Sequence, residues 1–334
     1  MSVPLVIAHR GVPGLRLEHT RPSYELAIEL GADFIEPDVV ASADGVLVVR
    51  HENEIGGTTD VADHPEFSSR RTTKTVDGAE KTGWFTEDFT VAELKTLRAK
   101  ERIPDLRPQN VALQGQQQIL TFDEVMVLSA EHGLDGPAGV YVETKHPTYF
   151  EGLGISLNDL LIDALERHGR NRADAGIIIQ SFEPTNLQQL RSRTPVFMMQ
   201  LLKTRGVPPD LEAAGSTRTY EDLRTDEGLA FVAGYADAIG PEKSLVISRD
   251  AEGRLGAPTG LVERSHAAGL DVHVWSMRNE NTFLPLDLRV GDEPSAHGDA
   301  EGEYLAYFDA GVDAVFSDDT GCAVRARGVW TARR

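Results

Sequence analysis

The chain has 334 residues, 40% of them hydrophobic, so it can bury a sizeable core in one large α/β domain or in two ordinary ones. Its 53 acidic residues against 33 basic ones give a formal net charge of -20, which argues against nucleic acid as a partner and against stable association with anionic membranes. Cys322 is the only cysteine, which excludes an intrachain disulfide and a thiolate zinc cluster.

The sequence has no run of about twenty apolar residues that would predict a membrane span. It also does not open with a charged segment followed by a longer apolar one, the pattern of a secretory signal peptide. We therefore expect a cytoplasmic protein if the chain is complete, and a secreted mature form stays open as the alternative. The oligomeric state is not indicated.

Apolar strand-like runs alternate with helix-like segments along the chain. In chain order, the predicted strands are 4–9, 33–40, 46–51, 138–144, 175–181, 195–201, 271–276 and 312–317. The predicted helices are 20–30, 121–132, 155–168, 184–193, 219–233, 257–268 and 303–310. Eight strands that alternate with helices predict an α/β fold, a (β/α)8 TIM barrel in which residues 1–334 form a single domain.

Three connections depart from regular alternation. Only the turn at Asp44-Gly45 separates 33–40 from 46–51, whereas parallel neighbours need a crossover of about a dozen residues, so the pairing of the third strand stays open. Residues 53–118 are polar and irregular apart from a helix predicted at 90–98, which indicates an inserted, functional segment after the third strand. The long connection from 203 to 256 contains Ile239-Gly240-Pro241, which we predict to be a turn.

Polar side chains recur where the predicted strands end. Side chains at the carboxyl ends of barrel strands converge on one mouth, so these residues should lie close together. In chain order, the candidates are His9, Arg10, Glu36, Asp38, His51, Glu143, Lys145, Gln180 and Trp275. Strand side chains alternate, so Glu36 shares a face with Asp38, and Glu143 shares a face with Lys145.

The carboxylates of Glu36, Asp38 and Glu143 offer three oxygen ligands, which suits Mg²⁺ or Ca²⁺. An isolated pair with the spacing of Glu36 and Asp38 is more often a pair of surface carboxylates, and Pro37 between them fits an edge strand or a bulge. At a barrel mouth, where strand pairing ends, the proline is acceptable. We therefore predict a divalent metal site.

The two histidines at strand ends suit proton transfer, because an imidazole can act as base or as acid near neutral pH. A lone histidine is more often structural, and we interpret the other eight in that way, including His19 and His146. Two cations near the predicted mouth, Arg10 and Lys145, could bind a phosphate. Trp275 could form a wall of the substrate pocket, although core packing would explain it nearly as well.

At these residues the chain resembles the glycerophosphodiester phosphodiesterase family. The matching segments near the N-terminus are His9-Arg10-Gly11, Glu18-His19-Thr20-Arg21-Pro22-Ser23, Gly31-Ala32-Asp33, Glu36-Pro37-Asp38-Val39, Asp44-Gly45 and Val48-Val49-Arg50-His51-Glu52. Later segments are Val142-Glu143-Thr144-Lys145, Gln180-Ser181-Phe182, Val274-Trp275-Ser276 and Asp313-Ala314-Val315-Phe316-Ser317-Asp318. Residues 59–64 and 83–86 look like the longer branch of the family, which carries an insertion.

The resemblance implies a (β/α)8 barrel that hydrolyses glycerophosphodiesters to glycerol 3-phosphate and an alcohol. It implies His9 and His51 as the acid/base pair, and the carboxylates named above as ligands of Mg²⁺ or Ca²⁺. It also implies that Arg10 and Lys145 hold the phosphate, with Glu18 near the same site, and Gln180 and Trp275 are further candidates for substrate contact. The chain departs from the family at His19, where asparagine is common, and at Glu52, where aspartate is common.

Two alternatives stay open at this point. A phospholipase D-like enzyme acting on lysophospholipids would keep the barrel but would need an apolar surface near the mouth, and the sequence shows no long apolar loop. A catalytically silent member that binds phosphodiesters or a protein partner would be expected to lose a catalytic histidine or a metal carboxylate. The chain keeps all five of these residues.

Overall fold

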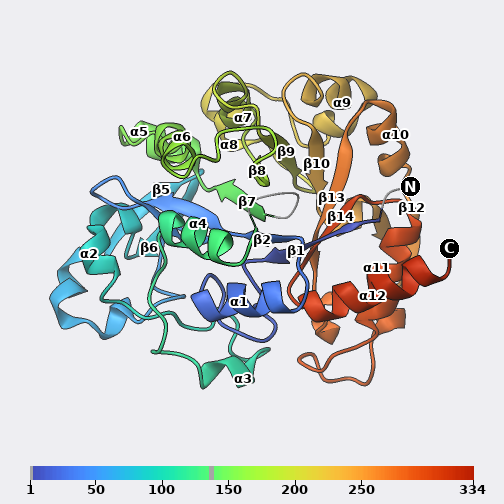
Figure 1. Ribbon diagram of the computed structural model, residues 1–334, viewed down its shortest axis with the longest axis horizontal. Helices are drawn as coiled ribbons and strands as arrows, with labels where there is room; N and C mark the ends of the chain where they lie inside the picture. Colours follow the sequence, from blue (N-terminus) through green and yellow to red (C-terminus); the bar gives the residue numbers. More distant parts are fainter. Residues whose placement is uncertain (1–2, 135–138) are drawn as a thin grey trace.

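A closed barrel of parallel strands forms the centre of the computed structural model, which describes residues 3–134 and 139–334 (Figure 1). The eight barrel strands, which we call staves, follow one another around the barrel, and the last pairs with the first. They are β1 (Leu5–His9), β2 (Phe34–Glu36) with its continuation β3 (Asp38–Ala41), β7 (Gly139–Thr144), β8 (Ile177–Ser181), β9 (Phe197–Leu202), β10 (Ala238–Pro241), β13 (Asp271–Met277) and β14 (Ala314–Ser317). The predicted (β/α)8 fold is confirmed, and residue 138 of the fourth predicted strand lies outside the described residues.

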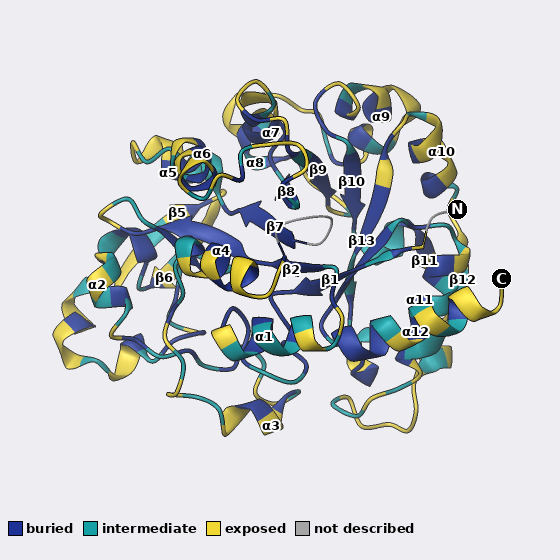
Figure 2. Cartoon of the chain, viewed as in Figure 1, coloured by how far each residue is buried: buried dark blue, intermediate teal, exposed yellow. Residues whose placement is uncertain are grey.

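The staves are buried on both faces, which is why they read as continuous apolar runs rather than alternating ones (Figure 2). Large side chains fill the barrel interior, including Ile7, Tyr141 and Phe316. The Tyr141 hydroxyl is 2.8 Å from His273 Nδ1, which satisfies both polar groups inside this apolar core. This packed interior provides a rigid floor beneath the carboxyl ends of the strands.

Amphipathic helices cover the outside of the barrel, with their buried faces on the strands and exposed residues outward (Figure 2). The longer ones are α1 (Arg21–Glu29), α4 (Phe122–Glu131), α6 (Leu157–Arg167), α7 (Pro184–Arg191), α9 (Asp226–Val232), α10 (Leu261–Ala267), α11 (Ala300–Asp309) and α12 (Thr320–Ala332). Shorter elements are α5 (Pro147–Gly152), α8 (Pro209–Ala213) and the strand pair β11 (Ile247–Arg249) and β12 (Leu255–Pro258). No helix in the described ranges has the length and apolar character to span a bilayer.

Two strand predictions are corrected by the structure. The segment predicted as the third barrel strand, 46–51, contains β4 (Leu47–Val49), which runs antiparallel to β3 and so is not a stave. The missing stave is β10, in the segment Ile239-Gly240-Pro241 that we predicted to be a turn. A side chain at Gly240 would meet Met199 Sδ at 2.4 Å, so glycine serves close packing in the barrel here rather than a turn.

The second stave is interrupted at Pro37, which lies between β2 and β3. Proline has no N–H to donate to a neighbouring strand, but its carbonyl still accepts a hydrogen bond of 3.0 Å from the Glu143 amide. Both halves of the stave pair with β7. The proline therefore changes the strand locally without separating Glu36 and Asp38.

The segment 53–118 follows β4 and so leaves the barrel after the second stave rather than the third. It contains the hairpin β5 (Thr72–Val76) and β6 (Ala79–Gly83), with α2 (Val91–Leu94) and α3 (Pro108–Val111). The helix predicted at 90–98 is limited to α2, with Thr90 and Glu93 forming its capping box. The hairpin was missed, although Asp77-Gly78 is a strong turn signal and both residues adopt positive φ.

Candidate active site

The register of the staves places the predicted site residues at one level of the barrel. In the pairing of β1 with β2, His9 is opposite Glu36. Asp38 is opposite Glu143 in the pairing of β3 with β7, and Glu143 is in turn opposite Gln180 on β8. Residues from four staves therefore meet at the carboxyl end of the barrel, where enzymes of this fold carry their active sites.

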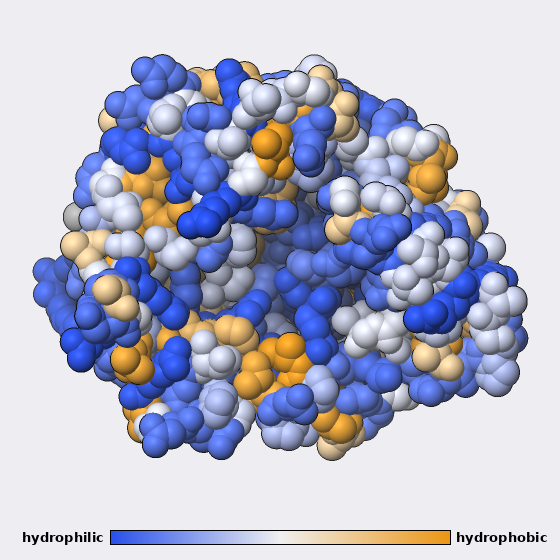
Figure 3. Space-filling model, turned by 180° about the vertical axis from the view of Figure 1, so that it is seen from behind, coloured by the Kyte–Doolittle hydropathy of each residue, from blue (hydrophilic) through white to orange (hydrophobic). Residues whose placement is uncertain are grey.

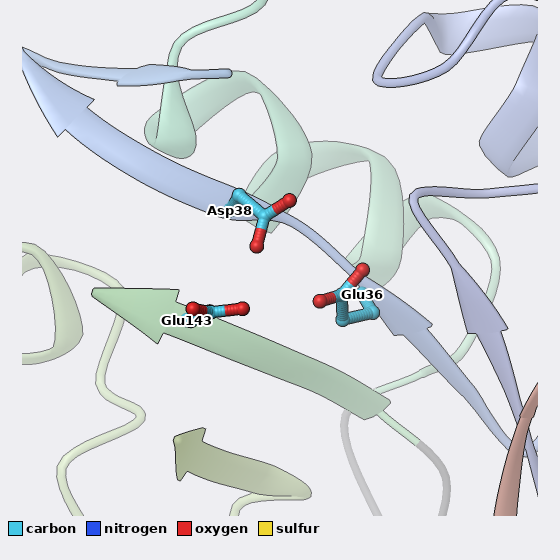
Figure 4. A group of neighbouring side chains, drawn as sticks. All are labelled: Glu36, Asp38 and Glu143. Carbon is cyan, nitrogen blue, oxygen red and sulfur yellow. The ribbon is translucent and has the colours of Figure 1, made fainter. Parts of the chain in front are cut away.

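Three carboxylates face one another at this level (Figure 4). One oxygen from each of Glu36, Asp38 and Glu143 lies within 4.8 Å of the other two. Glu36 accepts hydrogen bonds from the Arg10 amide at 2.7 Å and from Gln180 Nε2 at 2.9 Å. The Asp38 Oδ1 atom is buried and has no hydrogen-bond partner in the described part of the chain. The close approach of three carboxylates, with one oxygen of Asp38 unpaired, makes the cluster suitable for a metal ion.

The charges in the cluster support the same conclusion. Burial raises the pKa of Glu36 well above its ordinary value, and Asp38 and Glu143 raise it further. Burial also raises the pKa of Glu143 to about 8, against the opposing effect of Lys145. Burial alone would raise the pKa of Asp38, but Lys145, His51 and His19 together hold it well below its ordinary value. A divalent cation would relieve the repulsion among three buried carboxylates.

The orientation of the His9 ring is fixed by a hydrogen bond to a carboxylate. Its Nδ1 donates a hydrogen bond of 2.6 Å to Asp318 Oδ1, and its Nε2 lies 3.4 Å from Ser276 Oγ. Burial, together with the neighbouring Arg10 guanidinium, lowers the pKa of His9 to about 4. The ring is therefore neutral at pH 7 and presents an unprotonated Nε2 as a proton acceptor.

His51, which lines the same cavity as His9, has a similar arrangement. Its Nδ1 lies 3.0 Å from Glu52 Oε1, and Lys145 Nζ donates a hydrogen bond of 3.2 Å to its Nε2. Burial lowers the pKa of His51 well below its ordinary value, with Arg10 and Lys145 adding to the effect. Glu52 is held in turn by an ion pair with Lys81 from the β5–β6 hairpin.

The cations predicted to bind phosphate lie beside the carboxylates. Lys145 Nζ donates a hydrogen bond of 2.7 Å to Glu143 Oε1, and Arg10 Nε lies 3.5 Å from Asp38 Oδ2. Glu18 accepts from Arg10 at 3.2 Å and from two nitrogens of Arg102 at 2.6 and 2.9 Å. Glu18 thus orients the Arg10 guanidinium.

Two adjoining cavities open at this site, and the face of the molecule shown in Figure 3 has a hydrophilic hollow near its centre. The inner cavity, of about 90 Å³, is lined by residues that include His9, Glu36, Gln180 and Arg278. The outer cavity, of about 260 Å³, extends from His51 toward the inserted segment. The residues that border both cavities are His51, Glu143, Lys145, Phe182 and Trp275.

Several residues at the site were missed by sequence reasoning. Asp318 holds His9 and also accepts from Arg107 at 2.5 Å, while Glu52 lies beside His51. His19 was interpreted as structural, but its Nε2 donates to Asp38 Oδ2 at 2.9 Å and so orients a candidate metal ligand. Asp318 and Glu52 stood within the matching motifs, whereas nothing local singled out Arg107.

Arg107 lies in the inserted segment and supports His9 through a buried ion-pair network. It donates hydrogen bonds to Glu280 at 2.6 Å and to Asp318 at 2.5 Å, and all three side chains are almost fully buried. We expect Arg107→Ala to lower the free energy of unfolding by about 3 kcal/mol, because two buried carboxylates each lose an ion-pair partner. Urea unfolding would measure this.

The matched control is Arg172→Ala, which removes an exposed ion pair with Asp174. Exposed pairs contribute little, so this variant should lose less than about 1 kcal/mol. Equal losses in the two variants would show that the buried network does not carry the stability assigned to it.

A barrel whose mouth joins an acidic cluster, two oriented imidazoles and two cations defines an enzyme for phosphoester chemistry. The model of the glycerophosphoryl diester phosphodiesterase family matches residues 9–322. Glycerophosphodiester phosphodiesterase GDPD6 of Arabidopsis thaliana is 36% identical over 338 residues, covering 96% of this chain and 85% of that protein. The chain therefore belongs to the glycerophosphoryl diester phosphodiesterase family and is a phosphoric diester hydrolase of that kind.

Other relatives and solved structures agree. A glycerophosphodiester phosphodiesterase of Bacillus subtilis is 29% identical, covering 83% of this chain and 77% of that protein. A glycerophosphoryl diester phosphodiesterase structure from Silicibacter pomeroyi covers 99% of this chain and 95% of its own, with a TM-score of 0.69 and 20% identity. A phosphodiesterase structure from Oleispira antarctica, described as a complex with the product sn-glycerol-3-phosphate, has a TM-score of 0.60 and 20% identity, and covers 97% of this chain and 96% of its own.

Proposed function

We propose that the protein hydrolyses glycerophosphodiesters to glycerol 3-phosphate and an alcohol, using a divalent cation and two histidines. The observation that carries the proposal is the buried cluster of Glu36, Asp38 and Glu143 at a cavity that both His9 and His51 line. All-oxygen ligands suit Mg²⁺ or Ca²⁺. When bound, such a cation supplies a positive charge that stabilises the phosphate oxygens as the transition state forms.

The phosphate would lie where the two cavities meet. Lys145 borders both cavities and Arg10 borders the inner one, so the two side chains can neutralise the non-bridging oxygens from two directions. The contacts of Glu18 with Arg10 and Arg102 hold the Arg10 guanidinium in place. In the proposed complex Arg10 and Lys145 bind the phosphate, and Glu18 positions Arg10.

The two histidines take the two proton-transfer roles. A nucleophilic oxygen, from water or from a hydroxyl of the substrate, loses its proton as it bonds to phosphorus, and the bond to the leaving oxygen breaks. His51 borders both cavities, whereas only the inner one is lined by His9. We assign His9 as the general base. His51, whose pKa lies well below its ordinary value in the free protein, would take up a proton when the negative charge of the bound phosphate raises that pKa, and would then act as the general acid that protonates the leaving alkoxide. With water the product is glycerol 3-phosphate, and with a substrate hydroxyl it is a cyclic phosphate.

The lysophospholipid alternative is less well supported. It needs an apolar surface near the mouth on which an acyl chain can lie. The large hydrophobic residues most exposed among the described residues line neither cavity; they are Val3, Val111, Val127, Leu153, Leu286 and Val290. The silent alternative is also disfavoured, because both histidines and all three carboxylates lie in one site.

The test is a coupled assay for glycerol 3-phosphate release over a panel of glycerophosphodiesters, with lysophosphatidylcholine as the lipid comparison. We expect release from the diesters and a loss of at least about a hundredfold after chelation, since a metal ion contributes several kcal/mol to such reactions. Adding back Mg²⁺ or Ca²⁺ separately identifies the ion that restores turnover. Full activity in protein shown by elemental analysis to be metal-free would contradict the metal role, and faster turnover of the lysolipid would favour the alternative.

A further inference from the structure

The outer cavity is placed to receive one arm of a phosphodiester. A diester carries two alcohol arms on one phosphorus, and the two cavities meet at His51, Glu143 and Lys145. The inner cavity is small, at about 90 Å³, and is bordered by two of the candidate metal ligands, Glu36 and Glu143, so it suits the constant glycerol arm. The outer cavity, of about 260 Å³, has room for a second arm of variable structure.

The inserted segment contributes Asp77 to the wall of this cavity. Asp77, at the tip of the β5–β6 hairpin, accepts a hydrogen bond of 2.6 Å from His146 Nδ1, and His146 follows β7. Lys81 on β6 forms an ion pair with Glu52, beside His51. These two ion pairs attach the hairpin to the barrel mouth. The hairpin tip therefore lies beside whatever binds in the outer cavity.

Some of the charged side chains that line the outer cavity have ion-pair partners among the residues that the structure describes, and one does not. Glu52 and Asp77 are engaged by Lys81 and His146, as described above. Burial raises the pKa of the Glu183 carboxyl to about 8, so this group is largely uncharged at pH 7. Lys203 forms no hydrogen bond or ion pair that is found among the described residues, and its ammonium lies 4.8 Å from the centre of the Phe182 ring.

We propose that the outer cavity binds the leaving alcohol, and that Lys203 makes it selective for hydroxyl-rich, uncharged head groups over quaternary ammonium head groups. The ammonium of Lys203 can donate hydrogen bonds to the oxygens of a polyol. It also repels a cationic head group and covers the Phe182 ring on which such a group would otherwise stack. The inference rests on the proposed function and names the alcohol class for the same site.

The experiment compares kcat/KM for glycerophosphoinositol and glycerophosphocholine in wild-type protein and in Lys203→Met. We expect the wild type to prefer the inositol diester, and Lys203→Met to shift the ratio by about tenfold toward choline, the scale for removing one nearby like charge. Lys203→Glu should shift it further, because the new carboxylate attracts the choline cation. Lys100→Met is the matched control, since Lys100 lines neither cavity, and its ratio should stay at the wild-type value.

A kcat/KM ratio that stays within about twofold of wild type in both Lys203 variants would overturn the inference, because a charge that lines the head-group cavity should change the ratio more than that. An equal shift in Lys100→Met would also overturn it, since the effect would then follow net charge rather than the cavity. Failure of the wild type to release glycerol 3-phosphate from either diester is a different result. It would overturn the proposed function itself.

Discussion

Replacing His51 or His9 with alanine is expected to lower kcat for glycerophosphoinositol by about a hundredfold or more, the usual contribution of a general acid or base. His9 is buried and His51 is half-buried at the mouth, and Asp318 and Glu52 orient the two rings. The measurement is steady-state release of glycerol 3-phosphate. His132→Ala, at an exposed position outside the site, should leave kcat unchanged. Near-wild-type turnover in either site variant would remove that histidine from the mechanism.

The same variants test which histidine is the acid. A diester of glycerol phosphate with p-nitrophenol has a leaving group that needs no proton, so loss of the general acid should matter little with this substrate. We therefore expect His51→Ala to recover most of its activity on the nitrophenyl diester, and His9→Ala to remain impaired. The reverse pattern would exchange the two roles, and equal impairment would show that neither ring acts mainly on the leaving group.

The second large effect is expected for Asp38→Ala. Asp38 is fully buried, lies opposite Glu143, and has an oxygen without a hydrogen-bond partner in the described part of the chain. Removing this ligand should weaken Mg²⁺ or Ca²⁺ binding and lower kcat/KM by about a thousandfold, in line with the several kcal/mol that a catalytic cation supplies. Titration calorimetry with each cation and the coupled assay would measure the two effects.

Glu25→Gln is the control for Asp38→Ala, because it removes a carboxylate that pairs with Arg21 on the surface of α1. It should change neither cation binding nor turnover. Unchanged cation affinity in Asp38→Ala would remove Asp38 from the metal site even if activity fell. A loss of both properties, with a normal unfolding transition, would support Asp38 as a ligand.

Local sequence patterns predicted most of the barrel strands. The apolar runs at 4–9 and 175–181 are typical of buried parallel strands, and the structure confirms both as staves. The stave β10 was missed because Gly240 and Pro241 are typical turn residues, and only the close approach of Met199 explains the glycine. The long helix α12 was also missed. Its glycines, Gly321 and Gly328, lower helix propensity, and contacts with α11 and β1 compensate.

The sequence by itself determined which residues stand at the strand ends and which of them share a face of a strand. Strand side chains alternate, so Glu36 and Asp38 lie on the same face. Only the tertiary structure determined which other side chains contact and orient these residues. Arg107 reaches Asp318 across 211 residues of chain, and the hairpin tip at Asp77 reaches His146 across 69. Such ion pairs leave no periodic or local signal, because the two partners meet only after the parallel strands have closed the barrel.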